Sequence, residues 1–222
     1  MANILCLDFD DTIVIENTAR LVFERFAAPD GRDVEAEYHA GRLSVEQFNA
    51  AALRTVEASP EELRQFSVES VTVRPGLLEL FDWAHWNGWV VTVVSNGFDF
   101  YVDGVLDAIG ADRVARHAGR TRHDYRWLVT YYSPRGIELE EGFKLSYAAA
   151  FQNSGDFVAY VGDGASDVPA ARLAQAVFAR DTLLARLGGE HPRLWPFETF
   201  HDIVAVLEAE SPPWPIETRT NP

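Results

Sequence analysis

The sequence has little of several features that would each indicate a particular class of protein. Cys6 is the one cysteine among 222 residues, so an internal disulfide is excluded and a reducing compartment is expected. No apolar run approaches the roughly 18 residues that span a bilayer, and the first residues lack the basic region of a signal peptide. We therefore expect a cytoplasmic protein.

Positive charge is also scarce. The chain has 19 lysine and arginine residues and 34 acidic residues, which gives a formal net charge of −15 at pH 7. Nucleic acids and anionic membranes bind clustered basic side chains, so neither is an expected partner. A small anionic substrate is compatible with this charge, because a few local cations can outweigh a distant field. Lys144 is the single lysine, and every other basic residue is an arginine.

The remaining composition is that of a globular protein, with 47% hydrophobic and 24% charged residues. The length predicts one domain with an insertion, or two small domains. Apolar runs predict strands at 4–7, 89–94, 157–161 and 176–179. Helical periodicity predicts helices near 77–86, 98–109, 144–151, 168–174 and 200–208. Alternation of the two indicates an α/β fold with a doubly wound parallel sheet, to which a hairpin within 114–132 could be added.

About fifty residues after the first strand are predicted to be helical throughout. Ser44 with Gln47 resembles a capping box, and Ser59 before Pro60 resembles a helix start. We therefore expect a small all-helical cap at 13–73 over a Rossmann-like core, which would comprise 1–12 and 74–210. The residues 211–222 form a proline-rich tail.

Polar side chains follow three of the predicted strands. They are Asp8 and Asp10, then Ser95 and Asn96, then Asp163 and Asp167. Ligands of open α/β sheets bind beyond the carboxyl ends of the strands, so these side chains should converge on one crevice. Carboxylates that are close together repel one another unless a cation joins them, and hard oxygen ligands suit Mg²⁺. The alternative, that each of these residues only caps a helix, becomes weaker when all three sites are considered together.

The spacing of these residues suits phosphoryl transfer. Asp8 and Asp10 lie two residues apart on an extended segment and so can face one substrate. One of them can attack phosphorus while the other donates a proton to the leaving oxygen. Thr12 can brace that loop, and Ser95 with the amides after it can bind phosphoryl oxygens. Lys144 can supply a compact positive charge.

These segments resemble, in order, the four motifs of the haloacid dehalogenase superfamily. The motifs are Asp8-Phe9-Asp10-Asp11-Thr12, Ser95-Asn96, Lys144, and Gly162-Asp163-Gly164-Ala165-Ser166-Asp167. The resemblance implies a Rossmann-like core, Mg²⁺ and an aspartyl-phosphate intermediate. It implies further that Asp8 is the nucleophile and Asp10 the general acid and base. Asp8, the Asp10 carbonyl, Asp163 and Asp167 would hold the metal, while Thr12, Ser95, Asn96, Gly97 and Lys144 would serve the phosphoryl group.

The resemblance extends to one branch of the superfamily. An aspartate at Asp10 favours phosphoryl transfer over dehalogenation, and a helical cap at 13–73 is typical of the phosphoserine-phosphatase-like branch. Within it, the segment 95–102 is most similar to that of the MtnX-like phosphatases, which act on a keto-enol phosphate of methionine salvage. Asn17 stands where phosphoserine phosphatases carry a glutamate, which disfavours phosphoserine as the substrate.

The resulting hypothesis is a Mg²⁺-dependent phosphatase for a small phosphorylated metabolite, either a monomer or a homodimer. Two alternatives are a phosphotransferase or mutase that uses the same intermediate, and a catalytically silent binding protein on this fold. Specificity is expected to reside in the cap, where Arg20, Arg42 and Arg54 are candidate contacts. The six histidines form no zinc-binding pattern. Cys6 is expected to be a core residue rather than a nucleophile.

Overall fold

The computed structural model describes residues 1–28 and 34–209 of the chain. The predicted tail at 211–222 therefore lies outside the described residues, as does a short piece of the predicted cap. Searching the helices of these two ranges finds none with the length and apolar character needed to cross a membrane.

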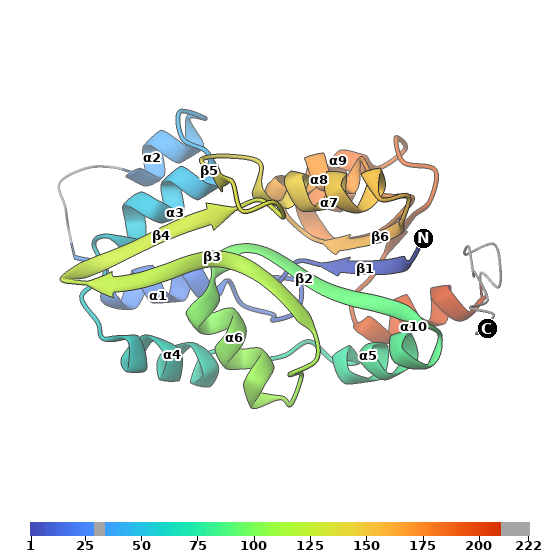
Figure 1. The fold of residues 1–222 in the computed structure, drawn as a ribbon, viewed down its shortest axis with the longest axis horizontal. Helices are drawn as coiled ribbons and strands as arrows, with labels where there is room; N and C mark the ends of the chain where they lie inside the picture. The colour runs from blue at the N-terminus through green and yellow to red at the C-terminus, as the bar shows by residue number, and fades with distance from the viewer. Residues whose placement is uncertain (29–33, 210–222) are drawn as a thin grey trace.

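An eight-stranded sheet lies at the centre of the molecule, in the order β5-β4-β3-β2-β1-β6-β7-β8 (Figure 1). The strands are β1 (Asn3–Leu7), β2 (Trp89–Phe98), β3 (Ala115–Asp124), β4 (Arg126–Tyr132), β5 (Glu138–Leu139), β6 (Phe157–Gly162), β7 (Ala176–Ala179) and β8 (Leu194–Pro196). The six neighbours β3-β2-β1-β6-β7-β8 pair in parallel. β4 pairs antiparallel with β3, and β5 pairs antiparallel with β4. The sheet is thus mixed rather than wholly parallel, because the predicted hairpin extends it at one edge.

Helices cover both faces of this sheet, as a doubly wound fold requires. They are α1 (Thr18–Phe26), α2 (Val34–His39), α3 (Val45–Leu53), α4 (Pro60–Glu69), α5 (Leu77–Trp86), α6 (Asp99–Ala108), α7 (Phe143–Asn153), α8 (Val168–Ala171), α9 (Asp181–Leu187) and α10 (Phe200–Ala209), with a 3-10 turn η1 (Ala165–Asp167). Figure 1 shows α5 and α10 on one side of the sheet and α7, α8 and α9 on the other.

The position of β1 in the sheet explains why its residues 4–7 are all apolar. It lies between β2 and β6, so both of its edges are paired. Leu5 and Leu7 point into the core shared with α5 and α10, whereas Ile4 and Cys6 point into the core shared with α7, α8 and α9. Because successive side chains alternate between two buried faces, none of them can be polar without cost.

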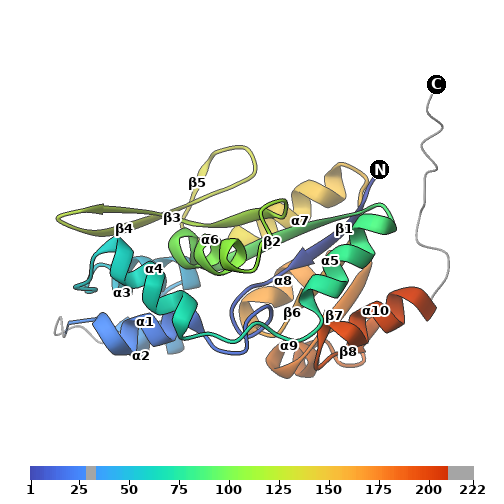
Figure 2. The same cartoon turned by 90° about the horizontal axis from the view of Figure 1, so that it is seen from below.

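The helices α1 to α4 lie between β1 and α5, and we call residues 13–73 the cap. A bridge between Val14 and Val73 closes its base. The predicted capping box of Ser44 and Gln47 is present at α3, and Ser59 caps α4 in the same way. Figure 2 shows that the β3–β4 hairpin extends over this cap. Trp127 of β4 donates its indole N–H to the Ala58 carbonyl at 2.9 Å, which ties the hairpin to the cap.

Two details differ from the sequence-based expectation. Strand β2 was expected to end at residue 94, but it continues to Phe98 through an irregular register that begins at Val94. The predicted phosphate-binding residues 95–97 therefore lie inside this irregular part of the strand. The elements β5, β8 and α9 were not predicted. β5 and β8 have two and three residues, too few to show a pattern, and the seven residues of α9 make only two helical turns.

Candidate functional site

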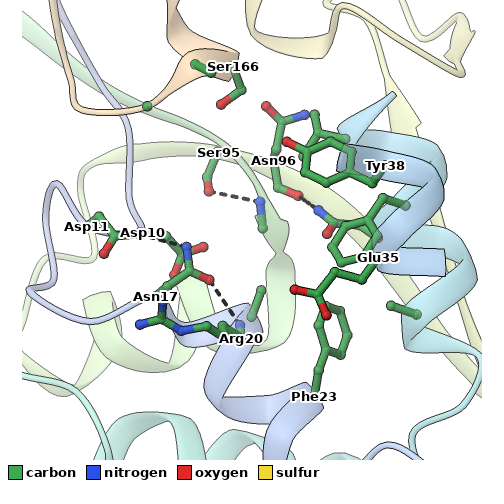
Figure 3. A pocket seen from close by; sticks show the side chains of 18 of the residues that line it. Asp10, Asp11, Asn17, Arg20, Phe23, Glu35, Tyr38, Ser95, Asn96 and Ser166 are labelled. Carbon is green, nitrogen blue, oxygen red and sulfur yellow. Dashed lines mark hydrogen bonds between the residues drawn. The ribbon is translucent and has the colours of Figure 1, made fainter. Parts of the chain in front are cut away.

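The carboxyl ends of β1, β2 and β6 meet at one edge of the sheet, as expected for parallel neighbours. A cavity of about 990 Å³ opens between this edge and α1, α2 and α3 of the cap. Asp10 and Ser95 face Phe23, Glu35 and Tyr38 across this cavity (Figure 3). The predicted site residues that line it are Asp8, Asp10, Ser95, Asn96, Gly97, Lys144 and Asp163.

Lys144 joins two of the predicted carboxylates. Its ammonium group lies 2.8 Å from Asp8 Oδ1 and 2.7 Å from Asp167 Oδ1, and all three side chains are buried. Burial by itself lowers the pKa of Lys144, but the carboxylates of Asp167 and Asp8 outweigh it and raise that pKa above its ordinary value. Lys144 is therefore a fixed positive charge beside Asp8, well placed for an anionic phosphoryl group.

Asp8 is the carboxylate at the cavity that pairs with Lys144. It is 5% exposed and borders the cavity at the end of β1. Burial and the charge of Asp167 raise the pKa of Asp8, while Lys144 acts in the opposite direction. The ion pair with Lys144 therefore helps to keep Asp8 ionised, as a nucleophile must be.

Asp167 is fully buried and does not line the cavity. Its Oδ1 accepts the Tyr160 hydroxyl at 2.7 Å as well as the Lys144 ammonium group. Its Oδ2 accepts the backbone amides of Asp163 and Gly164 at 3.2 and 2.8 Å. Because both oxygens are occupied in this way, Asp167 is better suited to position Lys144 and the Asp163 loop than to bind a metal directly.

The group of carboxylates fits a divalent cation. One oxygen each of Asp8, Asp163 and Asp167 lies within 4.8 Å of the others. Burial and then the charge of Asp167 raise the pKa of Asp163 to about 7, a sign that negative charge is crowded here. A bound cation would relieve this crowding, and a set of carboxylate oxygens suits Mg²⁺. Asp8 and Asp163 are the members of the group that reach the cavity.

Thr12 was predicted to contact phosphate, but its hydroxyl faces another partner. The residue is fully buried and does not line the cavity. Its hydroxyl donates to Asp163 Oδ1 at 2.9 Å. Thr12 therefore orients one of the carboxylates that suit a metal.

Asp10 is held by two donors. Its Oδ1 accepts the Thr18 backbone amide at 2.7 Å, and its Oδ2 accepts the Tyr101 hydroxyl at 2.5 Å. Burial raises the pKa of Asp10 even though these hydrogen bonds lower it. A carboxyl group whose pKa is raised is suited to donate a proton and later to take one back.

Sequence reasoning missed Tyr101, which is fully buried on α6. A side chain at Gly97 would collide with the Tyr101 hydroxyl, so the glycine makes room for the tyrosine to reach Asp10. The signal in the sequence is weak, because nothing in a Gly-x-x-x-Tyr spacing by itself indicates an aspartate ninety residues earlier.

Arg74 is a second residue that sequence reasoning missed. The loop after β1 passes through a left-handed conformation at Asp11, whose φ is 59°. Arg74 is 6% exposed and donates to the carbonyls of Asp11 and Thr12, in each case at 2.7 Å. These bonds from the base of the cap hold the strained loop that carries Asp8 and Asp10.

The Ser95–Gly97 segment is hydrogen-bonded to the cap through Asn96. Ser95 borders the cavity, and its Oγ accepts the Gly97 amide at 3.0 Å. The Asn96 side-chain amide donates to Glu46 Oε1 of α3 at 2.9 Å. Asn96 therefore borders the cavity as predicted, but its side-chain donor is paired with the cap.

The cap side of the cavity combines aromatic and aliphatic side chains with charged ones, which include Arg20, Glu24 and Glu35. Phe48 stacks on Tyr38 at 4.9 Å between ring centroids and meets Phe23 edge-on at 6.1 Å. Of the three arginines predicted as contacts, Arg20 lines the cavity, whereas Arg42 and Arg54 are exposed elsewhere. The remaining apolar lining residues of the cap include Ala28, Val34, Val45 and Ala52.

The other candidates from the sequence lie away from this cavity. Cys6 is fully buried among apolar side chains, and burial raises the pKa of its thiol, so it behaves as a core residue. In the described ranges, the one group of potential metal ligands consists of aspartates and contains no histidine.

Comparison with known proteins identifies the family. The model of the haloacid dehalogenase-like hydrolases matches residues 5–172. The chain belongs to this family, as its four motifs predict.

Two kinds of relative are similar over most of the chain. A Bacillus thuringiensis (strain Al Hakam) protein named 2-hydroxy-3-keto-5-methylthiopentenyl-1-phosphate phosphatase is 26% identical over 206 residues, or 90% of this chain and 94% of that protein. A structure described as a phospho-aspartyl intermediate analogue of phosphoserine phosphatase superposes with a TM-score of 0.67 at 21% identity, over 92% of this chain and 98% of that chain. A hydrolase from Salmonella enterica superposes with a TM-score of 0.70 at 15% identity, over 94% of this chain and 72% of that chain.

These findings confirm the predicted branch and fold class. The α/β fold is that of the phosphoserine phosphatases, and the curated relatives are phosphatases as well. The protein is an enzyme, a phosphatase of the haloacid dehalogenase type.

Proposed function

We propose that the protein hydrolyses a small phosphorylated metabolite in the presence of Mg²⁺, with Asp8 as the nucleophile. The observation that carries this proposal is the buried triangle of Asp8, Lys144 and Asp167 beside a cavity that also receives Asp10. The residues proposed for this chemistry, Asp8, Asp10, Ser95 and Lys144, line the same cavity.

The residues divide the work as follows. Asp8 attacks the phosphorus atom, and Asp10 protonates the oxygen of the departing alcohol. The same Asp10 then takes a proton from the water that hydrolyses the aspartyl phosphate. Ser95 and Lys144 bind the phosphoryl oxygens, and Asp8, Asp163 and the Asp10 carbonyl would hold Mg²⁺. The ion would offset the negative charge of the phosphoryl group.

The cap favours a leaving group with an apolar end. Phe23, Tyr38 and Phe48 form an aromatic wall opposite the carboxylates. Asn17 is engaged, since it caps α1 through Arg20 N and donates to Asp11 Oδ2 at 2.8 Å. It thus offers no carboxylate for an amino group. Both features favour a methylthio-bearing keto-enol phosphate of methionine salvage over phosphoserine.

The proposal is tested by measuring phosphate release with Mg²⁺ from a panel of phosphate monoesters. The panel should include the keto-enol phosphate named for the Bacillus relative, phosphoserine and an aryl phosphate. We expect hydrolysis, with a preference for the keto-enol phosphate. Acceptor alcohols added to the same assay would reveal a phosphotransferase by the transferred phosphate.

The matched variant is Asp8→Asn, which keeps the shape of the side chain but removes the nucleophile. Loss of the nucleophile from a concerted site lowers kcat by up to about 10⁶-fold. Retention of more than a few per cent of the activity by a folded Asp8→Asn protein would contradict the aspartyl-phosphate mechanism.

A further inference from the structure

One glutamate of the cap contacts two of the predicted phosphate-binding segments at once. Glu46 lies in the first turn of α3 and is 4% exposed. Its Oε1 accepts the Asn96 side-chain amide at 2.9 Å and the Phe143 backbone amide at 2.8 Å. Asn96 follows Ser95 in β2, and Phe143 precedes Lys144 at the start of α7. A single carboxylate oxygen therefore connects both segments to the cap.

Asn49 strengthens this connection from the next turn of α3. Its side-chain amide donates to the Asn96 carbonyl at 2.7 Å and to the Tyr131 hydroxyl at 3.1 Å. The Tyr131 hydroxyl in turn donates to the same Asn96 carbonyl at 2.5 Å. Glu46 thus holds the side chain of Asn96, while Asn49 and Tyr131 hold its backbone.

The contact also completes the start of α7. Gly142 is the N-cap residue of this helix and has no side chain that could accept a hydrogen bond from its first turn. Glu46 supplies that acceptor from the cap, and a negative charge is favourable at a helix N-terminus. A buried carboxylate is costly unless it accepts hydrogen bonds, so Glu46 is stabilised only when α3 is seated on the core.

We propose that Glu46 is a positioning residue that couples the seating of the cap to the assembly of the phosphate-binding residues. The proposal rests on the function proposed above. When α3 is seated, Asn96 and the first turn of α7 share one partner, and Ser95 and Lys144 are fixed relative to each other. When α3 withdraws, both segments lose that partner at the same moment. Phosphate is therefore bound most tightly under a closed cap.

The experiment is calorimetric titration of the Mg²⁺-loaded protein with inorganic phosphate. Glu46→Ala removes two hydrogen bonds, and we expect phosphate affinity to fall about tenfold. Glu46→Gln keeps an oxygen acceptor in the same place, and we expect an affinity within about threefold of the wild type. Thermal melts would establish that each variant is folded at the titration temperature.

Gln47→Ala is the control for losing a polar side chain of α3 that is not hydrogen-bonded to the proposed phosphate-binding segments. Gln47 neighbours Glu46 on α3 and contacts Glu140 of the core at 3.5 Å, but it contacts neither Asn96 nor Phe143. It should bind phosphate as the wild type does. Should Glu46→Ala not fold, Asn49→Ala replaces it, with an expected loss of about three- to tenfold.

The outcomes separate the two proposals. Unchanged phosphate affinity in folded Glu46→Ala, or an equal loss in Gln47→Ala, overturns the positioning role and leaves the phosphatase proposal intact. A wild-type protein that neither binds phosphate nor releases it from any monoester overturns the phosphatase proposal, and the positioning role with it.

Discussion

Three oxygen atoms surround the ammonium group of Lys144. They belong to Asp8, Asp167 and the Ser166 hydroxyl, at 2.8, 2.7 and 3.3 Å. The side chain is 4% exposed, and its ammonium group is held between two carboxylates, so a wider group would displace one of them. In a chain that uses arginine at every other basic position, this packing gives a physical reason for the one lysine.

Lys144→Arg should therefore be inactive although it keeps the charge. A guanidinium group is planar and wider than an ammonium group, so it would displace Asp8 or Asp167. A displacement of about 1 Å at reacting atoms can lower the rate about 10²-fold, and we expect at least this loss in kcat. The measurement is phosphate release, with circular dichroism as the control for folding. Wild-type turnover by Lys144→Arg would show that the lone lysine is an accident of composition.

For individual residues, the sequence predicts site residues that follow strands, but not site residues that other elements bring to the β1 loop. Asp8, Asp10 and Asp163 are recognisable because each comes directly after an apolar run. Tyr101 and Arg74 lie on other elements, and their roles arise from long-range contacts with the β1 loop. The partner of Thr12 could not be foreseen for the same reason, because Asp163 is distant in the sequence.

We expect the helices of the cap to distinguish substrates. The proposed phosphate-binding residues would contact only what all phosphate monoesters share, so recognition of the leaving group is expected from α1, α2 and α3, which line the cavity. Their contribution includes the aromatic wall of Phe23, Tyr38 and Phe48.

Phe48→Ala should lower kcat/KM for the keto-enol phosphate by about 10- to 100-fold, because an apolar pocket that loses a ring loses much of its discrimination. Its kcat/KM for phosphoserine should change little. Phe66→Ala is the matched control, since Phe66 packs against Phe26 in the cap and does not line the cavity. An identical substrate ranking in wild type and Phe48→Ala would place the specificity outside this wall.

The elements themselves were largely predictable. The strand at 176–179 and the helix at 77–86 agree with the structure residue by residue, because their apolar patterns are clear. The division of the chain into core and cap stays a prediction. The long β3–β4 hairpin was foreseen only as a possibility, since its strands are rich in exposed arginine and histidine and lack a regular alternation.

The stability of the whole molecule should depend on pH, because the carboxylates of Asp8, Asp163 and Asp167 lie close together at the expected cation site. The pKa of Asp163 is raised to about 7 in the protein without metal, from an ordinary value of 3.8. Between about pH 4 and pH 7 the folded protein keeps a proton that the unfolded chain has lost. The stability of the metal-free protein should therefore fall as the pH rises through this range.

Magnesium should have the opposite dependence, because it competes with that proton. We expect Mg²⁺ to raise Tm more at pH 8 than at pH 6, with an apparent affinity that changes by up to about tenfold per pH unit below pH 7. Thermal melts with Mg²⁺ or with a chelator at both values provide the measurement. Asp163→Asn should weaken this pH dependence, and the raised pKa of Asp8 should account for what remains. An equal Mg²⁺ effect at both pH values in the wild type would contradict the assignment of Asp163 as a ligand.

The central place of β1 has a consequence for how the chain is made. β1 leaves the ribosome first, yet its second neighbour in the sheet, β6, begins only at Phe157. Pairing over such a separation is slow, because a long loop must be closed before the contacts form. During synthesis this buried strand therefore keeps one edge unpaired, and such an edge is a surface on which nascent chains aggregate. The edge of β1 that β6 covers can therefore be paired only after more than two thirds of the chain has been made.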